Sequence, residues 1–121
     1  MGKTILHADD SAAVRRWVAE QLSDDEIRVV SAADGDVALQ MLRLDAFDLL
    51  LTDLEMPNLD GLSLAAAVRE LPAYRFLPIL IFSSKKPTEV DPQLRQLVTG
   101  WIVKPAAPEQ LRRWVRRSLP R

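Results

Sequence analysis

The 121-residue chain contains no cysteine, a single histidine and only short apolar runs. Without cysteine it can form neither a disulfide framework nor a thiolate metal site. No apolar run approaches the roughly 20 residues that a membrane-spanning helix requires, and Asp9 and Asp10 interrupt the N-terminus too early for a secretory signal. A net charge of −1 gives no general attraction to nucleic acid or to an anionic membrane. We therefore expect a soluble, cytoplasmic protein without membrane insertion.

What the sequence does contain is a regular alternation of short apolar runs with helical patterns. Hydrophobic residues make up 48% of the chain and charged residues 27%, which is ordinary for a globular domain. Such alternation is typical of a parallel sheet whose strands are buried on both faces. We predict a single α/β domain spanning 1–121, a doubly wound five-stranded parallel sheet with helices on both faces and no effector domain. The expected strands are 4–8, 27–30, 48–52, 79–82 and 102–103.

The helical segments lead to four local predictions. Ser11 or Asp10 caps the first helix, and apolar spacing carries the third helix through Leu71. Aspartate followed by proline at 91–92 supplies an N-cap and a first-turn proline, so the fourth helix is expected over 92–98. The last helix begins at Pro108, with Leu111, Trp114, Val115 and Leu119 facing the core.

Polar residues follow the ends of four of the strands. Because the carboxyl ends of parallel strands meet at one edge of the sheet, these side chains should converge there. Three acids at one edge repel one another unless a divalent cation is bound. Oxygen ligands without cysteine suit Mg²⁺ or Mn²⁺ better than zinc, and Mg²⁺ readily shares its coordination shell with a phosphate. The set predicts a metal and phosphoryl site formed by Asp9, Asp10, Asp53, Ser83 and Lys104.

Each of these residues also has a structural interpretation. Asp9 and Asp10 could be a helix N-cap and its solvated neighbour, and a serine that closes a strand is usually a turn residue. Lys104 could form a structural ion pair with Asp53. We expect Lys104 to pair with Asp53 at rest and with a phosphoryl oxygen afterwards. The peptide bond between Lys104 and Pro105 is a candidate for the cis form.

Four segments of the chain resemble a known family. Residues 5–11, 51–61, 77–83 and 100–105 are similar, in order and spacing, to the motifs of two-component response-regulator receiver domains. The likeness is greatest to the stand-alone chemotaxis receivers of the CheY type, and it covers essentially the whole chain. It implies the flavodoxin-like fold of those receivers, with the strand order 2-1-3-4-5 that CheY itself has.

The resemblance implies a role for each residue of the predicted site. Asp53 would accept a phosphoryl group from a sensor histidine kinase or a phosphotransfer protein. Asp9 and Asp10 would bind Mg²⁺ together with Asp53 and the backbone carbonyl of Glu55. The remaining side chains bind the phosphoryl oxygens (Lys104 and Ser83) or act as the conformational switch (Ser83 and Trp101).

The same resemblance implies a signalling switch rather than an enzyme. Such a protein catalyses only its own aspartyl phosphorylation and slow dephosphorylation. It would then bind a downstream protein, not identified by the sequence, through the fourth helix, the fifth strand and the last helix. With no DNA-binding motif in the chain, we expect no direct DNA binding.

The chain departs from the family at two places. Leu97-Val98 stands where the family usually has Gly-Ala, and the segment 83–104 is one residue short, so we expect a short or displaced fourth helix. Glu55 and Lys85 occupy the rim positions that flank the path of water to the phosphoryl group. We hypothesise that they form an exposed ion pair that impedes this water; the alternative is two solvated side chains that never meet.

Two other features have no assigned role. His7 is expected to be a core residue with satisfied hydrogen bonds. The arginines at 112, 113, 116 and 117 complement the dipole of the last helix, or else form a basic strip for an acidic partner.

Two other functions remain as alternatives to the switch. An aspartate-nucleophile phosphohydrolase also places an aspartate after a strand, but it pairs this residue with a second aspartate two positions later, where this chain has Glu55. The other alternative is a receiver-like interaction module that is never phosphorylated, which the complete set of site residues disfavours.

Overall fold

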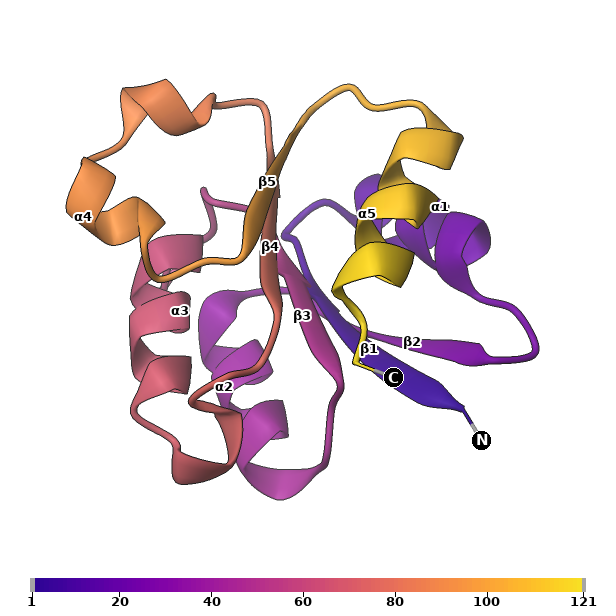
Figure 1. The fold of residues 1–121 in the computed structure, drawn as a ribbon, viewed down its shortest axis with the longest axis horizontal. Helices are drawn as coiled ribbons and strands as arrows, with labels where there is room; N and C mark the ends of the chain where they lie inside the picture. Colours follow the sequence, from indigo (N-terminus) through magenta and orange to yellow (C-terminus); the bar gives the residue numbers. More distant parts are fainter. Residues whose placement is uncertain (1, 121) are drawn as a thin grey trace.

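The computed structural model describes residues 2–120, which form one parallel β-sheet flanked by helices (Figure 1). The strands follow the order β2-β1-β3-β4-β5, so the predicted fold class and strand order are confirmed. Every neighbouring pair is parallel. No helix in this part of the chain is long and apolar enough to cross a lipid bilayer. The strands are β1 (Lys3–Ala8), β2 (Ile27–Ala32), β3 (Leu49–Thr52), β4 (Ile79–Ser83) and β5 (Gly100–Val103).

Helices cover both faces of the sheet, with α1 and α5 on one side and α2 and α3 on the other (Figure 1). Alternate strand residues point to opposite faces, so Ile5 and Leu51 pack toward α1 and α5 while Leu6 and Leu50 pack toward α2 and α3. Both faces are therefore apolar, which explains the unbroken hydrophobic runs of the central strands. The helices are α1 (Ala12–Leu22), α2 (Gly35–Leu44), α3 (Gly61–Arg69), α4 (Pro92–Arg95) and α5 (Pro108–Ser118), with 3₁₀ turns η1 (Pro72–Tyr74) and η2 (Pro87–Glu89).

Side-chain caps start the helices directly beyond the carboxyl edge of the sheet. Ser11 caps α1 by accepting a hydrogen bond of 3.2 Å from the backbone of Val14, which decides between the two predicted caps. Asp34 caps α2 and Asp60 caps α3 in the same manner. These caps satisfy backbone N–H groups that the first helical turn leaves free. They also fix where each loop at the carboxyl edge ends.

Two helices are shorter than predicted. The α3 helix ends at Arg69 rather than continuing through Leu71, because Pro72 disfavours the helical conformation in the residue before it and Leu71 is extended. The α4 helix spans 92–95 rather than 92–98. Its C-terminal continuation must turn to pair with β4, where the backbone N–H of Thr99 donates to the carbonyl of Ile79 at 2.7 Å. The expected short fourth helix is present.

A guanidinium group holds the segment that follows α4. Arg69 donates from Nε to the carbonyl of Leu97 at 3.1 Å and from one terminal nitrogen to that of Leu77 at 2.7 Å. Arg69 thus joins the end of α3 to the chain entering β4 and to the chain entering β5. This contact holds Leu97, where the chain leaves α4 through two hydrogen-bonded turns rather than a longer α-helix.

His7 differs from its prediction. The side chain is fully buried, and neither ring nitrogen has a hydrogen-bond partner among the described residues. Burial, opposed by the Asp9 carboxylate and reinforced by Lys104 and Arg15, lowers the pKa of His7 to about 4. His7 is therefore a neutral, unsatisfied core residue rather than a satisfied one.

Replacing His7 with leucine is expected to stabilise the fold by about 1–3 kcal/mol at neutral pH, because two buried unpaired nitrogens are removed. The stability difference between His7→Leu and wild type should increase as the pH falls. The lowered pKa of His7 means that the unfolded chain takes up a proton near pH 6.5 while the folded protein resists it down to about pH 4. Protonation of His7 in the unfolded chain therefore costs the wild type no stability above pH 6.5. As the pH falls from 6.5 to about 4, the free energy of unfolding of the wild type decreases.

Urea unfolding of wild type and His7→Leu at pH 7.5 and pH 5, in EDTA, measures both effects. The difference between the two proteins should widen by about 2 kcal/mol at the lower pH. An unchanged difference would show that the histidine does not resist protonation in the folded protein.

Candidate functional site

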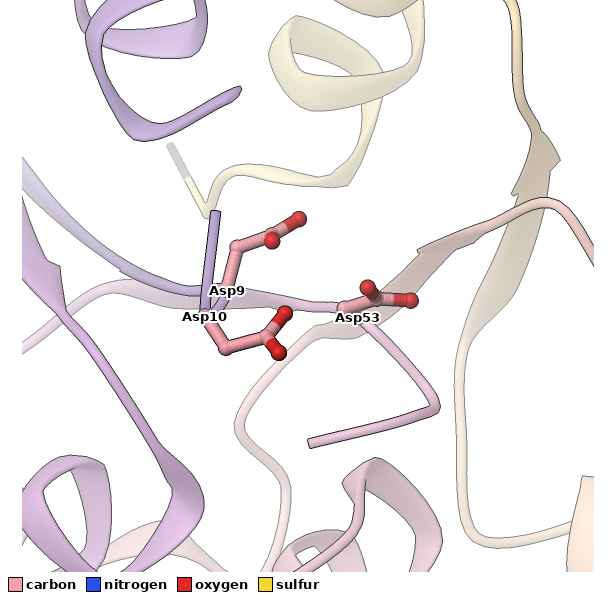
Figure 2. A group of neighbouring side chains, drawn as sticks. All are labelled: Asp9, Asp10 and Asp53. Carbon is pink, nitrogen blue, oxygen red and sulfur yellow. The ribbon is translucent and has the colours of Figure 1, made fainter. Parts of the chain in front are cut away.

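Three carboxylates gather at the carboxyl ends of β1 and β3. Asp9, Asp10 and Asp53 each offer one oxygen, and these oxygens all lie within 4.8 Å of one another. Figure 2 shows the three side chains at the ends of the two neighbouring strands. The register places them there, because the backbone N–H of Asp53 donates to the carbonyl of Ala8 at 2.9 Å.

The two less exposed carboxylates are held by backbone groups. Asp9, which is 1% exposed, accepts a hydrogen bond of 2.9 Å from the backbone N–H of Ser11 through Oδ1. Asp53 accepts one of 2.7 Å from the backbone N–H of Leu54, also through Oδ1. Each of these residues thus has one oxygen oriented by the loop that follows it. The second oxygen of each, Oδ2, faces the ammonium group of Lys104.

Gly61 brings the start of α3 close to the backbone of Asp53. A side-chain Cβ at position 61 would collide with the carbonyl oxygen of Asp53. The backbone N–H of Gly61 instead donates to the carbonyl of Leu54 at 2.8 Å. Glycine at this position therefore allows the tight β3–α3 loop that surrounds Asp53.

Lys104 supplies positive charge to two of the acids. Its Nζ lies 2.9 Å from Oδ2 of Asp9 and 3.4 Å from Oδ2 of Asp53. The sequence predicted the pair with Asp53, whereas the shorter contact is with the more buried Asp9. The peptide bond between Lys104 and Pro105 is cis. Phe82 lies beneath the ammonium group, with its ring centroid 5.1 Å from Nζ.

The electrostatics favour a cation at this edge. Burial raises the pKa of Asp53; Lys104 opposes this shift and the neighbouring Asp9 adds to it. An uncompensated negative charge on Asp53 is thus costly, and a divalent cation would remove the cost. The donor set consists of carboxylate oxygens, which matches the preference of Mg²⁺ and Mn²⁺. The exposed Asp10 leaves room for the water ligands that Mg²⁺ retains.

Ser83 and Trp101 are joined through the backbone of Lys85. Ser83 is 1% exposed, and its Oγ accepts a hydrogen bond of 3.2 Å from the backbone N–H of Lys85. The indole N–H of Trp101 donates to the carbonyl of the same residue at 2.8 Å. The Trp101 ring packs beside Leu54 and Leu62. Sequence reasoning missed this link, because the indole N–H gives no signal of its partner until the loop is folded.

Glu55 and Lys85 lie at the rim of the site. Lys85 Nζ is 4.0 Å from Oε2 of Glu55, and both side chains are about half exposed. They also border a cavity of about 560 Å³ that continues between α3 and the η2–α4 segment. At this distance the two charges form an exposed ion pair.

An apolar hollow borders the site on the side of α1. It has a volume of about 610 Å³ and lies between α1 and the loop after β5, with Ala13, Trp17, Phe82 and Ala106 in its lining. The rings of Trp17 and Phe82 stack with centroids 6.3 Å apart. Lys104 also reaches its wall.

Comparison with known proteins identifies the family. Residues 5–116 match the family described as response regulator receiver domain. The chain belongs to this family. It is 32% identical over 119 residues to the chemotaxis protein CheY of Pseudomonas aeruginosa, covering 97% of this chain and 96% of that protein. The receiver also spans 30% of the length of a protein-glutamate methylesterase/protein-glutamine glutaminase of Syntrophomonas wolfei, to which it is 38% identical.

Solved structures agree with this assignment. CheY4 of Vibrio cholerae superposes with a TM-score of 0.87 at 34% identity, covering 98% of the receiver and all of CheY4. The receiver domain of the sensor histidine kinase PA1611 of Pseudomonas aeruginosa superposes with a TM-score of 0.86 at 25% identity, with 98% of each chain covered. That structure holds a magnesium ion in its active site cleft. The Asp9, Asp10 and Asp53 cluster resembles such a magnesium site.

Asp53→Asn is expected to raise the melting temperature in EDTA. The substitution removes one of the repelling carboxylates, while the ion pair between Lys104 and Asp9 remains. Added Mg²⁺ should reverse the order: at about a hundred times its Kd it stabilises wild type by about 2.7 kcal/mol, and the variant by much less.

Thermal unfolding of both proteins with EDTA and with MgCl₂ tests this crossover. Asp25→Asn removes one charge from an exposed position and serves as the matched control. Equal Mg²⁺ stabilisation of the Asp53 variant and the control would exclude Asp53 as a metal ligand.

Proposed function

We propose that this receiver is a cytoplasmic phosphoacceptor switch of a two-component phosphorelay. In this proposal Asp53 accepts a phosphoryl group from a histidine kinase or a phosphotransfer protein, and the altered surface binds a downstream protein. The convergence of Asp53 with Lys104 and two further acids at one strand edge carries the proposal. A chain that only preserved the fold would have no physical reason to keep three repelling carboxylates together.

The chemistry follows from the groups that surround Asp53. A carboxylate oxygen of Asp53 attacks the phosphorus of a phosphohistidine; an O–P bond forms, the N–P bond breaks, and the imidazole leaves with the electron pair. Asp9, Asp10, Asp53 and the backbone carbonyl of Glu55 would hold Mg²⁺, which neutralises charge on the transferring phosphoryl group. Lys104 then exchanges part of its contact with carboxylates for a phosphoryl oxygen. Its distance of 3.4 Å from Asp53 permits this with little movement.

The apolar hollow beside α1 supports a protein as the phosphoryl donor. A phosphohistidine must reach Asp53 at the edge of the sheet, so the protein that carries it covers the adjoining surface. Trp17 is partly exposed there, stacked on the buried ring of Phe82, and Lys104 joins this surface to the site. Exposed apolar surface next to a charged centre favours a docked partner over a small free donor.

Ser83, Lys85 and Trp101 supply a route from the phosphoryl group to the output surface. If Ser83 turns its hydroxyl to donate to a phosphoryl oxygen, its contact with the Lys85 backbone changes. The indole N–H of Trp101 donates a hydrogen bond to the carbonyl of Lys85, so a movement of this loop would move the indole ring. A new charge at Asp53 thus biases the position of an aromatic ring on β5.

The two alternatives are less well supported. For a phosphohydrolase, Glu55 would have to act as acid and base, but its side chain is 64% exposed and lies beside Lys85. For an interaction module that is never phosphorylated, the raised pKa of Asp53 and its contact with Lys104 would have no use.

Incubation with Mg²⁺ and a small acyl phosphate, followed by intact-mass measurement, separates the three functions. The switch is expected to gain one phosphoryl group. This gain should be absent in Asp53→Asn and, because charge neutralisation is lost, slowed about a hundredfold or more in Lys104→Ala, in line with the loss of one transition-state contact. Rapid multiple turnover of the acyl phosphate would indicate the phosphohydrolase. No gain of mass would indicate the interaction module that is never phosphorylated.

The ion pair at the rim is proposed to slow the approach of water to the aspartyl phosphate. Glu55→Ala and Lys85→Ala should each accelerate dephosphorylation by up to about fivefold, since an exposed pair contributes at most about 1 kcal/mol. The double variant should add little to either, because both changes remove the same contact.

Decay of the phosphoryl mass with time measures these rates, and Lys86→Ala, at the next exposed lysine, is the control. Unchanged dephosphorylation rates in both single variants would refute the proposal that the ion pair slows the approach of water.

A further inference from the structure

The loop between β3 and α3 supplies two of the proposed magnesium ligands. It begins at Asp53, and the backbone carbonyl of Glu55 lies two residues further along. The backbone N–H of Gly61 donates to the carbonyl of Leu54 at 2.8 Å, which closes the base of the loop. No backbone N–H within residues 2–120 donates to the carbonyl of Glu55, which leaves this oxygen available to a cation. Its position must be set by contacts elsewhere in the loop.

Asn58 joins the middle of this loop to the start of α2. Its Nδ2 donates to Oδ2 of Asp34 at 3.2 Å, across 24 residues of sequence. The other oxygen of Asp34, Oδ1, accepts a hydrogen bond of 2.8 Å from the backbone N–H of Val37 and caps α2. One carboxylate therefore fixes both the helix and the loop, with a separate oxygen for each.

The backbone of the loop is adapted to this contact. Asn58 has a φ of 71°, the only positive φ among the non-glycine residues of the described chain. Asparagine adopts this left-handed conformation more readily than most residues do. The adjoining Leu59 packs against the first residue of α2, where a Cβ at position 35 would collide with the carbonyl oxygen of Leu59. Gly35 thus lets α2 and the loop come into backbone contact.

The place of this contact in the sheet relates it to the acidic cluster. The strands β2 and β3 lie on either side of β1. A contact between the start of α2, which follows β2, and the loop that follows β3 therefore joins the two neighbours of β1 at the edge where Asp9 and Asp10 lie. Figure 1 shows α2 and α3 side by side on the same face of the sheet. The start of α2 thus supports the loop from the side of β2.

We propose that Asp34, Gly35 and Asn58 are positioning residues of the magnesium site. They hold the β3–α3 loop so that the carbonyl of Glu55 stays within reach of a cation bound by Asp53. None of the three belongs to the group of acids that could hold the ion, so each acts through the backbone of the loop. This inference rests on the proposed function, because the magnesium site belongs to that proposal, and it adds the start of α2 to the site.

The contact with α2 orders the loop before the cation binds. If the carbonyl faced the site in only a fraction of the molecules, the apparent affinity for Mg²⁺ would fall by that fraction. Mg²⁺ also demands near-ideal octahedral geometry and therefore tolerates little displacement of a ligand. Loss of the contact with α2 should weaken Mg²⁺ binding even where the fold survives.

Titration with MgCl₂, followed by the amide NMR shifts of the protein, measures the Kd directly. Asp34→Ser keeps a capping oxygen for α2 but is too short to reach Asn58, and Asn58→Gly keeps the positive φ but has no side chain. Each variant is expected to raise the Kd of Mg²⁺ about threefold, within the range of one lost hydrogen bond. Asp36→Ser removes an exposed charge from the same first turn of α2 and, because salt screens such charges, should leave the Kd within about 1.5-fold of wild type.

Exchanging the two side chains tests the hydrogen bond itself. Asn58→Asp sets two carboxylates against each other and should raise the Kd, although its added negative charge would by itself attract Mg²⁺. Asn58→Asp/Asp34→Asn restores the hydrogen bond with donor and acceptor reversed, and it has the net charge of wild type. Asparagine also caps a helix as well as aspartate does. The double variant should therefore return the Kd to within about twofold of wild type.

Gly35→Ala tests the backbone contact. Alanine favours a helix more than glycine does, so α2 itself gains from the change. The added Cβ would meet the carbonyl of Leu59 and push the loop away. We expect the Kd to rise at least as much as in Asn58→Gly. All variants are also unfolded thermally in EDTA, which measures their stability apart from the metal.

The outcomes separate this inference from the function on which it rests. If wild type shows no saturable titration, or if Asp53→Asn binds Mg²⁺ as tightly, the magnesium site of the proposed function fails. If wild type binds and Asp53→Asn does not, a Kd in Asp34→Ser and Asn58→Gly equal to that of Asp36→Ser overturns the inference alone. A lower melting temperature in EDTA with an unchanged Kd has the same meaning, because the contacts then serve the fold and not the site. Failure of the exchanged pair to restore the Kd equally overturns it.

Discussion

The balance of charge at the carboxyl edge of β1 and β3 is the constraint on which the rest of this receiver depends. Three carboxylates lie within reach of a single cation, and Lys104 contacts two of them, with Asp9 nearer than Asp53. Because burial raises the pKa of Asp53, this residue carries the part of the charge that is least well compensated. A divalent cation and a phosphoryl group are the additions that would satisfy the edge, so the same electrostatic imbalance underlies the metal site and the proposed phosphoacceptor.

The two sides of this edge are built differently. On the side of α1, the buried Asp9 accepts a hydrogen bond from the backbone of Ser11, and the rings of Trp17 and Phe82 stack. On the side of β4 and β5 the loop after Ser83 is held by single hydrogen bonds to the Lys85 backbone. A rigid side suits the binding of metal and donor, whereas a loop held by a few contacts can respond to a new charge at modest cost. In the proposed function, the part of the site that would respond to a phosphoryl group is thus the loop after Ser83, next to β5.

The family likeness and the departures from it lie in different parts of the chain. The site agrees with the receiver family, whose pattern covers residues 5–116. The segment after β4 has instead the 3₁₀ turn η2 and a four-residue α4, and Arg69 at the end of α3 holds Leu97 beyond α4 to Leu77 before β4. The four-residue α4 leaves α5 as the longer of the two helices beside β5, with Trp114 partly exposed on its surface.

Sequence periodicity alone was sufficient for the sheet, because strands buried on both faces must be apolar throughout and their polar ends must meet at one edge. Strand order and the role of each acid came from the family resemblance. What only the tertiary structure decided were contacts between segments distant in the chain. Thr99 must pair with β4, which ends α4 early. Gly100 allows the ring of the partly exposed Trp114 to lie against β5, and His7 is enclosed where no partner among the described residues reaches its nitrogens. Local propensity contains no information about these neighbours, because each depends on the distance between elements that only packing of the whole chain establishes.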